Sequence, residues 1–366
     1  MKKSNKIRVG ITQGDINGIG YEVILKMLED TRMAELCDII IYGSAKIAAF
    51  YRKAAELPQV NLTQIDTPDE ARDGSYSIIN VVGEDVKVEP GVSTEAAGQA
   101  AFAALERATA DLRAGEIDVL VTAPINKHNI QSDAFRFPGH TEYLESSLAD
   151  EENPKAMMIM ASDNIRVALV TTHVPLKDVP QLITREAVEA SILALSKSLE
   201  RDFAISSPRI AVLALNPHAG ENGLLGSEEA DAITPAIEEA RRRKVLCFGP
   251  YPADGFWGSE AYTHFDGVLA MYHDQGLAPF KALAMNEGVN FTAGLPFART
   301  SPDHGTGYDI AGKGQADPES MRQAVYLAID VFRNRARHDE AHRNPLRKQY
   351  FEKGNDNVVL DLTKED

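Results

Sequence analysis

Short runs of apolar, largely β-branched residues alternate with longer helix-like segments, and this alternation constrains the fold more than any other feature. Continuous apolar runs are typical of strands buried on both faces of a sheet. We predict strands at residues 7–12, 39–42, 119–123, 165–171, 210–215, 268–272 and 289–292. We predict helices at residues 21–30, 94–114, 185–201, 228–244 and 319–335. Such an order indicates an α/β fold with a mostly parallel sheet.

Three local features refine this prediction. Ser93 or Thr94 is placed to cap the helix at 94–114, and Gly115 is placed to end it. The polar, Gly- and Pro-interrupted stretch 66–91 is interpreted as a hairpin excursion, and the charged tail after Arg335 is expected to fray. The length of 366 residues suits two domains, or one large one, at about 150 residues per domain.

The charge balance narrows the classes of partner. The formal net charge is −16, which argues against a nucleic-acid coat or a protein held on anionic lipid. The chain contains two cysteines, Cys37 and Cys247, so no disulfide framework is expected. No apolar run reaches the roughly 18 residues of a membrane helix, and the basic start leads directly into a strand. We therefore expect an unprocessed cytoplasmic protein without nucleic-acid or membrane partners.

Three histidines follow predicted strands, and ligands of open α/β sheets bind beyond the carboxyl ends of strands. His173, His218 and His273 occupy these positions. Imidazoles on rigid strand ends could hold a divalent metal with positions left open for substrate oxygen. Asp274, beside His273, could orient that ring or accept a proton. The same histidines are equally compatible with solvated loops or with core positions that satisfy hydrogen bonds.

Other polar residues suggest an anion site. His140-Thr141 precedes an apparent helix, where a donor and the helix start could face an anion, although Thr141 could simply cap that helix. Lys281 and Arg299 lie near the last predicted strand, which Asn290 begins, and could bind phosphate or carboxylate. On their own, these two cations are better explained as a solvated lysine and as a structural arginine that pairs with a neighbouring Asp.

Two glycine-rich stretches are candidates for a nucleotide site. The segment 303–314 contains four glycines and two aspartates, and it could wrap a nucleotide or form a tight structural loop. The segment 14–20 follows the first strand, but it has neither G-x-G-x-x-G spacing nor a Walker lysine. No G-x-S-x-G nucleophile motif occurs, so covalent catalysis gains little support.

Six ordered motifs together resemble the 4-hydroxythreonine-4-phosphate dehydrogenase family of pyridoxal phosphate biosynthesis, over about residues 7–335. The motifs are Thr12-Gln13-Gly14-Asp15…Gly18-Ile19-Gly20, Gly139-His140-Thr141-Glu142, Thr171-Thr172-His173, Asn216-Pro217-His218-Ala219-Gly220, Met271-Tyr272-His273-Asp274-Gln275-Gly276 and Arg299-Thr300-Ser301…Asp303-His304-Gly305-Thr306. The segment 303–314 also resembles the nucleotide loop of isocitrate and isopropylmalate dehydrogenases. The departures are Gln13, Ile16-Asn17 and Phe256-Trp257, where the family usually has other residues.

The resemblance implies two α/β/α domains with mostly parallel sheets and an active-site cleft between them, as in isopropylmalate dehydrogenase. Residues 1–135 and 292–366 would form a nucleotide-binding domain, and residues 136–291 a metal, substrate and dimerisation domain. A homodimer with shared active sites is implied. Each site would hold one divalent ion (Zn, Mg or Co) on His173, His218 and His273, with ligands drawn from both subunits.

The resemblance also assigns site residues. The substrate would contact His140, Thr141, Lys281, Asn290 and Arg299. NAD or NADP would be held by Gly294, His304, Gly305, Asp309 and Ile310. Asp274 or Asp254 would handle the proton.

The implied reaction is oxidation of 4-phosphooxy-L-threonine to a β-keto acid that loses CO2. The alternatives are a dehydrogenase of a phosphorylated sugar acid, such as 4-phosphothreonate or 4-phosphoerythronate, and a non-catalytic sensor of a phosphorylated metabolite.

Overall fold

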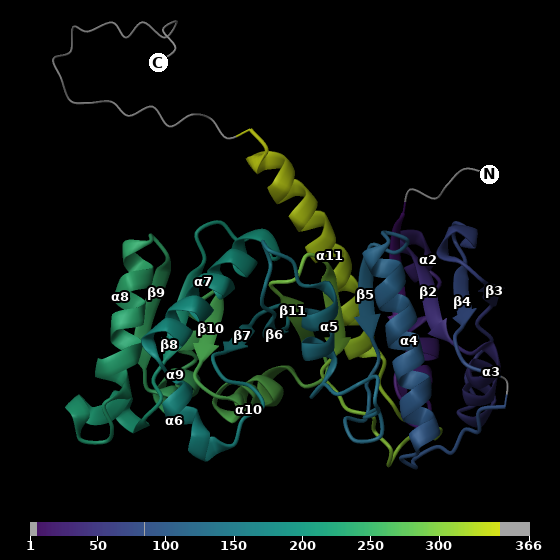
Figure 1. Ribbon diagram of the computed structural model, residues 1–366, viewed down its shortest axis with the longest axis horizontal. Coiled ribbons are helices and arrows are strands. Elements are labelled where there is room, and N and C mark those ends of the chain that lie inside the picture. The colour runs from purple at the N-terminus through teal and green to yellow at the C-terminus, as the bar shows by residue number, and fades with distance from the viewer. Residues whose placement is uncertain (1–5, 84, 345–366) are drawn as a thin grey trace, which may run out of the picture.

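The computed structural model describes residues 6–83 and 85–344, which form one sheet of twelve strands. The strand order is β3-β4-β2-β1-β5-β12-β11-β6-β7-β10-β8-β9, and the sheet runs the length of the molecule in Figure 1. The strands are β1 (Ile7–Thr12), β2 (Cys37–Gly43), β3 (Leu62–Ile65), β4 (Tyr76–Asn80), β5 (Val119–Thr122), β6 (Met157–Ala161), β7 (Arg166–Leu169), β8 (Arg209–Leu213), β9 (Leu246–Tyr251), β10 (Gly267–Ala270), β11 (Val289–Ala293) and β12 (Ala298–Pro302).

Helices cover both faces of this sheet. The α-helices are α1 (Gly20–Met27), α2 (Met33–Leu36), α3 (Ala45–Ala54), α4 (Glu95–Arg113), α5 (His140–Leu148), α6 (Val179–Leu182), α7 (Arg185–Arg201), α8 (Thr234–Arg242), α9 (Ala253–Gly258), α10 (His273–Ala284) and α11 (Glu319–His342). The longest of them, α11, packs against β12, β11 and β5 at the centre of the sheet (Figure 1). Among the described helices, none combines the length and apolarity that a membrane span requires.

The prediction of an α/β fold with a mostly parallel sheet is confirmed. Among the described strands, antiparallel pairing is confined to the centre, where β11 pairs with β12 and β6, and β6 pairs with β7. One end of the sheet contains β1 to β5 and β12, and the other contains β6 to β11. The boundary between these two halves of the sheet therefore lies between β12 and β11.

Several local predictions can now be judged. Thr94 caps α4 by accepting the N–H of Ala97, and Gly115 follows the helix with a φ of +72°, as predicted. The hairpin predicted at 66–91 is wrong, because that stretch contains β4, which pairs in parallel with β3 and β2. The expected fraying after Arg335 is wrong as far as His342, where α11 ends, and residues 345–366 lie outside the described part.

The two faces of the sheet are covered differently. On one face, a single apolar cluster extends under α1, α7, α8 and α11 from one end to the other. The opposite face carries two separate clusters, one under α4 and α5 and one under α9 and α10. Between them, β5, β12 and β11 present polar side chains in register: Thr122, Arg299, Ser301, Asn290 and Thr292. This polar strip is where the candidate site lies.

Candidate active site

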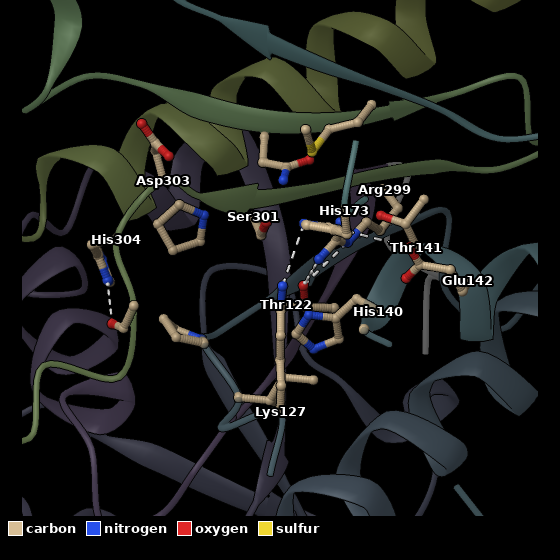
Figure 2. Close-up of a pocket in the computed structure, with 17 residues that line it drawn as sticks. Thr122, Lys127, His140, Thr141, Glu142, His173, Arg299, Ser301, Asp303 and His304 are labelled. Atoms are coloured by element: carbon tan, nitrogen blue, oxygen red, sulfur yellow. Dashed lines mark hydrogen bonds and ion pairs between the residues drawn. The ribbon is translucent and has the colours of Figure 1, made fainter. Parts of the chain in front are cut away.

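A cavity of about 270 Å³ lies over the polar strip. Strands β5, β11 and β12 form its floor, the first turn of α5 forms one wall, and the segment after β12 forms the opposite wall (Figure 2). Its lining residues are Thr122, Pro124, Ile125, Lys127, Gly139, His140, Thr141, Glu142, Met158, His173, Asn290, Arg299, Ser301, Pro302, Asp303, His304 and Gly305.

Arg299 is the central charge of this cavity and is only 2% exposed. Its Nε donates to Thr122 Oγ1 at 3.2 Å, and another guanidinium nitrogen donates to Thr292 Oγ1 at 3.1 Å. Within the part of the chain that the structure describes, no carboxylate lies within ion-pair distance of it. Burial lowers the pKa of Arg299 to about 9, and the charge of Glu142 opposes this shift. A buried cation without a carboxylate partner favours an anionic ligand.

Four further polar atoms around the cavity are buried and have no hydrogen-bond partner among residues 6–83 and 85–344. They are His140 Nε2, Asn290 Oδ1, Asp303 Oδ2 and His304 Nε2. Burial, the largest cause, lowers the pKa of both His140 and His304, so both rings are neutral at pH 7. Buried polar atoms are nearly always paired in folded proteins, so these atoms indicate a polar ligand.

Lys281 does not line the cavity but contacts Asp303, which does. It lies near the end of α10, and its Nζ is 2.9 Å from Asp303 Oδ1 and donates to the Asp303 carbonyl at 3.2 Å. Burial raises the pKa of Asp303, while Lys281 opposes that shift. The pair thus connects α10 to the wall that carries His304.

Two of the three predicted metal ligands lie side by side. The ring centroids of His173 and His273 are 6.0 Å apart. His273 Nδ1 is 2.7 Å from Asp274 Oδ1, so its Nε2 remains available. Lys127 Nζ lies 3.4 Å from His173 Nε2, and Glu142 Oε1 lies 3.7 Å from His173 Nδ1. A second hollow of about 550 Å³, lined by both histidines and Asp274, adjoins the cavity at His173.

His218 is placed differently from the other two. It is exposed on the turn Pro217–Gly223 after β8, although β7, β10 and β8 are neighbours in the sheet. In the described ranges, no three His, Cys, Asp or Glu side chains are close enough together to hold a metal ion. Within one chain, therefore, the three predicted ligands do not converge.

The turn that carries His218 is left-handed. Residues 218–222 have φ values between +43° and +79°, and four of these five residues are not glycine. The buried carboxylate of Glu229 supports the turn by accepting the N–H groups of Leu215 and Asn216 and the side-chain amide of Asn216. A strained conformation that the surroundings hold in place is typical of functional sites.

This strain gives a stability prediction. Ala219→Gly is expected to increase the free energy of unfolding by about 0.5–1 kcal/mol, because glycine lacks the Cβ that disfavours Ala219's φ of +52°. Urea unfolding measures the change. Ala110→Gly, on the exposed side of α4, is the control and should lower the free energy of unfolding by about 1 kcal/mol. Equal destabilisation by both changes would contradict the left-handed turn.

The remaining predicted residues are placed as follows. Thr141 does not cap α5: the helix starts at His140 after Gly139, and Thr141 lines the cavity. Asn290 lies on β11, as predicted, whereas Arg299 lies within β12 and not beyond a strand. Gly294 lies in the turn between β11 and β12, against the Lys155 carbonyl, and Asp254 is exposed on α9. Asp309 and Ile310 follow in the segment after His304 and Gly305.

The sequence reasoning did not single out Thr122, Lys127, Glu142 or Asp303 as site residues. Glu142 and Asp303 lie within two of the six motifs that carry the family resemblance, and that position is a usable signal. Thr122 lies within the strand predicted at 119–123, and Lys127 is a cation five residues after Thr122. No local pattern distinguishes that lysine from the many solvated ones.

Comparison with known proteins is consistent with this geometry. Residues 35–328 match the family of the pyridoxal phosphate biosynthetic protein PdxA. A 4-hydroxythreonine-4-phosphate dehydrogenase of Bacteroides thetaiotaomicron is 57% identical over 366 residues, 100% of both chains. One from a Sulfurihydrogenibium species is 41% identical over 323 residues, 88% of this chain and 98% of that one.

A solved structure agrees as well. The crystal structure of 4-hydroxythreonine-4-phosphate dehydrogenase from Klebsiella pneumoniae matches with a TM-score of 0.77 and 35% identity. The match covers 90% of this chain and 99% of that one. These findings confirm the resemblance drawn from the six motifs. The chain belongs to the family of the pyridoxal phosphate biosynthetic protein PdxA.

Proposed function

We propose that this chain oxidises 4-phosphooxy-L-threonine with NAD or NADP in the synthesis of pyridoxal phosphate. The product would be 2-amino-3-oxo-4-phosphooxybutanoate, which decarboxylates to 3-amino-2-oxopropyl phosphate. The observation that carries this proposal is the buried Arg299 with the unpartnered His140 and Asn290 atoms, beside two adjacent imidazoles, in a chain of this family.

The substrate's anionic groups account for the polar strip. A phosphate or a carboxylate would supply Arg299 with a negative partner and His140 Nε2 with an acceptor, whereas Asn290 Oδ1, itself an acceptor, would take a donor such as the substrate's ammonium or hydroxyl group. Lys127 adds a second positive charge at the rim of the cavity. These local charges would orient an anion inside a protein whose net charge of −16 opposes its approach.

The donor set fits one divalent ion (zinc, cobalt or magnesium) beside this strip. Asp274 holds Nδ1 of His273 and leaves Nε2 free, an arrangement typical of metal-binding histidine, and His173 lies next to it. We propose that His218 of a second copy completes the set. When bound, such an ion lowers the pKa of a substrate hydroxyl and polarises a carbonyl.

Asp274 is the proposed proton acceptor, because its carboxylate contacts His273 and is otherwise 84% exposed to the hollow and solvent. Asp254, the other candidate for the proton acceptor, would have to accept the proton from its position on α9. The nicotinamide nucleotide would lie along the segment that begins with His304 and Gly305, both of which line the cavity, and continues to Asp309 and Ile310. Gly294 would serve by shaping the turn before β12.

We further propose two domains, one formed by residues 1–135 together with 292–366 and the other by residues 136–291. The boundary between the two halves of the sheet, between β12 and β11, supports this division. The cytoplasm is the proposed location, since both cysteines are free and buried.

A homodimer is the proposed assembly, and sedimentation or light scattering tests it. The exposed His218 turn and the neighbouring Leu224, 79% exposed, support burial against a second copy. We expect a dimer at assay concentration. An active monomer would contradict a shared site.

A substrate panel tests the proposed reaction. Purified protein is mixed with a divalent metal and NAD or NADP, and reduced nicotinamide is followed by absorbance. We expect reduction with 4-phosphooxy-L-threonine and none with unphosphorylated 4-hydroxythreonine. Preference for 4-phosphothreonate or 4-phosphoerythronate would favour a sugar-acid dehydrogenase instead. Binding of these compounds without reduction of either nucleotide would favour a sensor.

A further inference from the structure

The glycine-rich segment after β12 is held in place by residues far away in the sequence. Residues 303–318, all of them described, form turns and bends without a helix or strand. Ordering such a segment is entropically unfavourable, so specific contacts must offset the loss of freedom. Tyr308, in the middle of the segment, makes several of these contacts.

The Tyr308 hydroxyl donates to Asp15 Oδ2 at 2.8 Å and accepts from Asn126 Nδ2 at 3.0 Å. The Tyr308 carbonyl lies against Gly91, where an added Cβ would approach it to 2.8 Å. Burial and Asp15 raise the pKa of Tyr308, so its hydroxyl keeps the proton that it donates. One side chain thus joins the segment to the turns after β1 and β5.

Asp15 is itself fixed. It is 1% exposed, and its carboxylate also accepts Asn129 Nδ2 at 2.7 Å and the backbone N–H of Asn17 at 2.9 Å. The carboxylate therefore has three donors from three parts of the chain, one of which is Tyr308. A hydrogen bond to a buried charged group is stronger than one between neutral groups.

The same segment accepts hydrogen bonds from two more residues near the start of the chain. The N–H of Ile19 donates to the Thr306 carbonyl at 2.9 Å. Lys26 on α1 donates to the carbonyls of Gly314 and Ala316 at 2.8 and 2.6 Å. The turn 14–20, which lacks the spacing of a phosphate loop, therefore supports the glycine-rich segment.

We infer that Asp15 is a positioning residue that, through the Tyr308 hydroxyl, holds the glycine-rich segment in the conformation that binds the nicotinamide nucleotide. This inference rests on the proposed function, in which that segment holds the nucleotide. His304 and Gly305 at its start line the cavity, so the order of the segment sets the shape of that wall.

Tyr308→Phe tests the inference because it deletes the hydroxyl alone. The Kd for NADH or NADPH, whichever the wild type binds, is measured by fluorescence or calorimetry without substrate. We expect it to rise on the order of tenfold, the equivalent of one charge-assisted hydrogen bond, and to rise at least as much in Asp15→Asn. The KM for the nucleotide should rise in parallel, whereas kcat at saturating nucleotide and the KM for 4-phosphooxy-L-threonine should stay within twofold.

Tyr76→Phe is the matched control. Tyr76 lies on β4, where its hydroxyl donates to the Asp30 carbonyl at 3.1 Å, and its loss should leave nucleotide affinity unchanged. A Tyr308→Phe protein with wild-type Kd would overturn the inference and leave the proposed function intact. A wild-type protein that binds neither nucleotide would overturn both. A loss of kcat together with the nucleotide effect would indicate general damage to the site and would also overturn it.

Discussion

Arg299→Met is expected to lower kcat/KM for the phosphorylated substrate by on the order of a thousandfold, about 4 kcal/mol of transition-state binding. The guanidinium is buried, carries its charge at pH 7 and has two threonine hydroxyls as neighbours. Removing it leaves the substrate's anion without its main positive partner in a desolvated cavity. The steady-state rate with varied substrate measures the loss.

The same change should not unfold the protein. Replacing a buried charge with an apolar side chain of similar volume is often neutral or stabilising, so the free energy of unfolding should hold or rise. Arg299→Lys is the matched control: it keeps one charge but cannot reach both Thr122 and Thr292 at once, and it should retain part of the activity. A stable Arg299→Met variant with full activity would contradict the anion-binding role of Arg299.

His218→Ala should lose bound metal and turnover while the fold survives. His218 is exposed and lies outside the apolar clusters, so its loss removes little packing. Metal content, measured by mass spectrometry, should fall from about one ion per chain to well below one. Turnover should fall on the order of a thousandfold. His342→Ala, exposed at the end of α11, is the control and should retain metal. Full metal occupancy in His218→Ala would contradict the assignment.

Mixing two inactive variants distinguishes a shared site from a site within one chain. In a mixed dimer of His218→Ala and His173→Ala, one site would combine an intact His173 and His273 with an intact His218 from the other copy. Activity should therefore return on mixing. Each mixed dimer should reach at most about half the activity of a wild-type dimer, because one of its two sites is complete. A mixture that stays inactive, with mixed dimers present, would contradict the shared site.

The apolar runs were sufficient to predict the class of fold and most of the central strands. They were insufficient for β12, whose sequence Ala298–Pro302 contains an arginine, a threonine and a serine. Arg299 and Ser301 face the cavity, and Thr300 donates to the Ala324 carbonyl of α11 on the opposite face, so the strand that forms the floor of the site has no apolar signature. Arg299 was consequently predicted to lie beyond a strand, although it lies within one.

The histidines show a second limit. The prediction that each follows a strand is confirmed for all three, and the strands β7 and β10 that precede His173 and His273 are neighbours, with the two rings close together. His218 follows β8, which pairs with β10, but it lies on a left-handed turn, and the three histidine side chains do not converge within the described part of one chain. No sequence periodicity reports five consecutive positive φ values.

A crystal structure with metal, nicotinamide nucleotide and 4-phosphooxy-L-threonine tests the central claim most directly. The account predicts an anionic group of the substrate on Arg299 and His140, and the metal between His173 and His273 of one chain and His218 of another. A substrate bound away from the strip formed by β5, β11 and β12, with Arg299 still without an anionic partner, would contradict it.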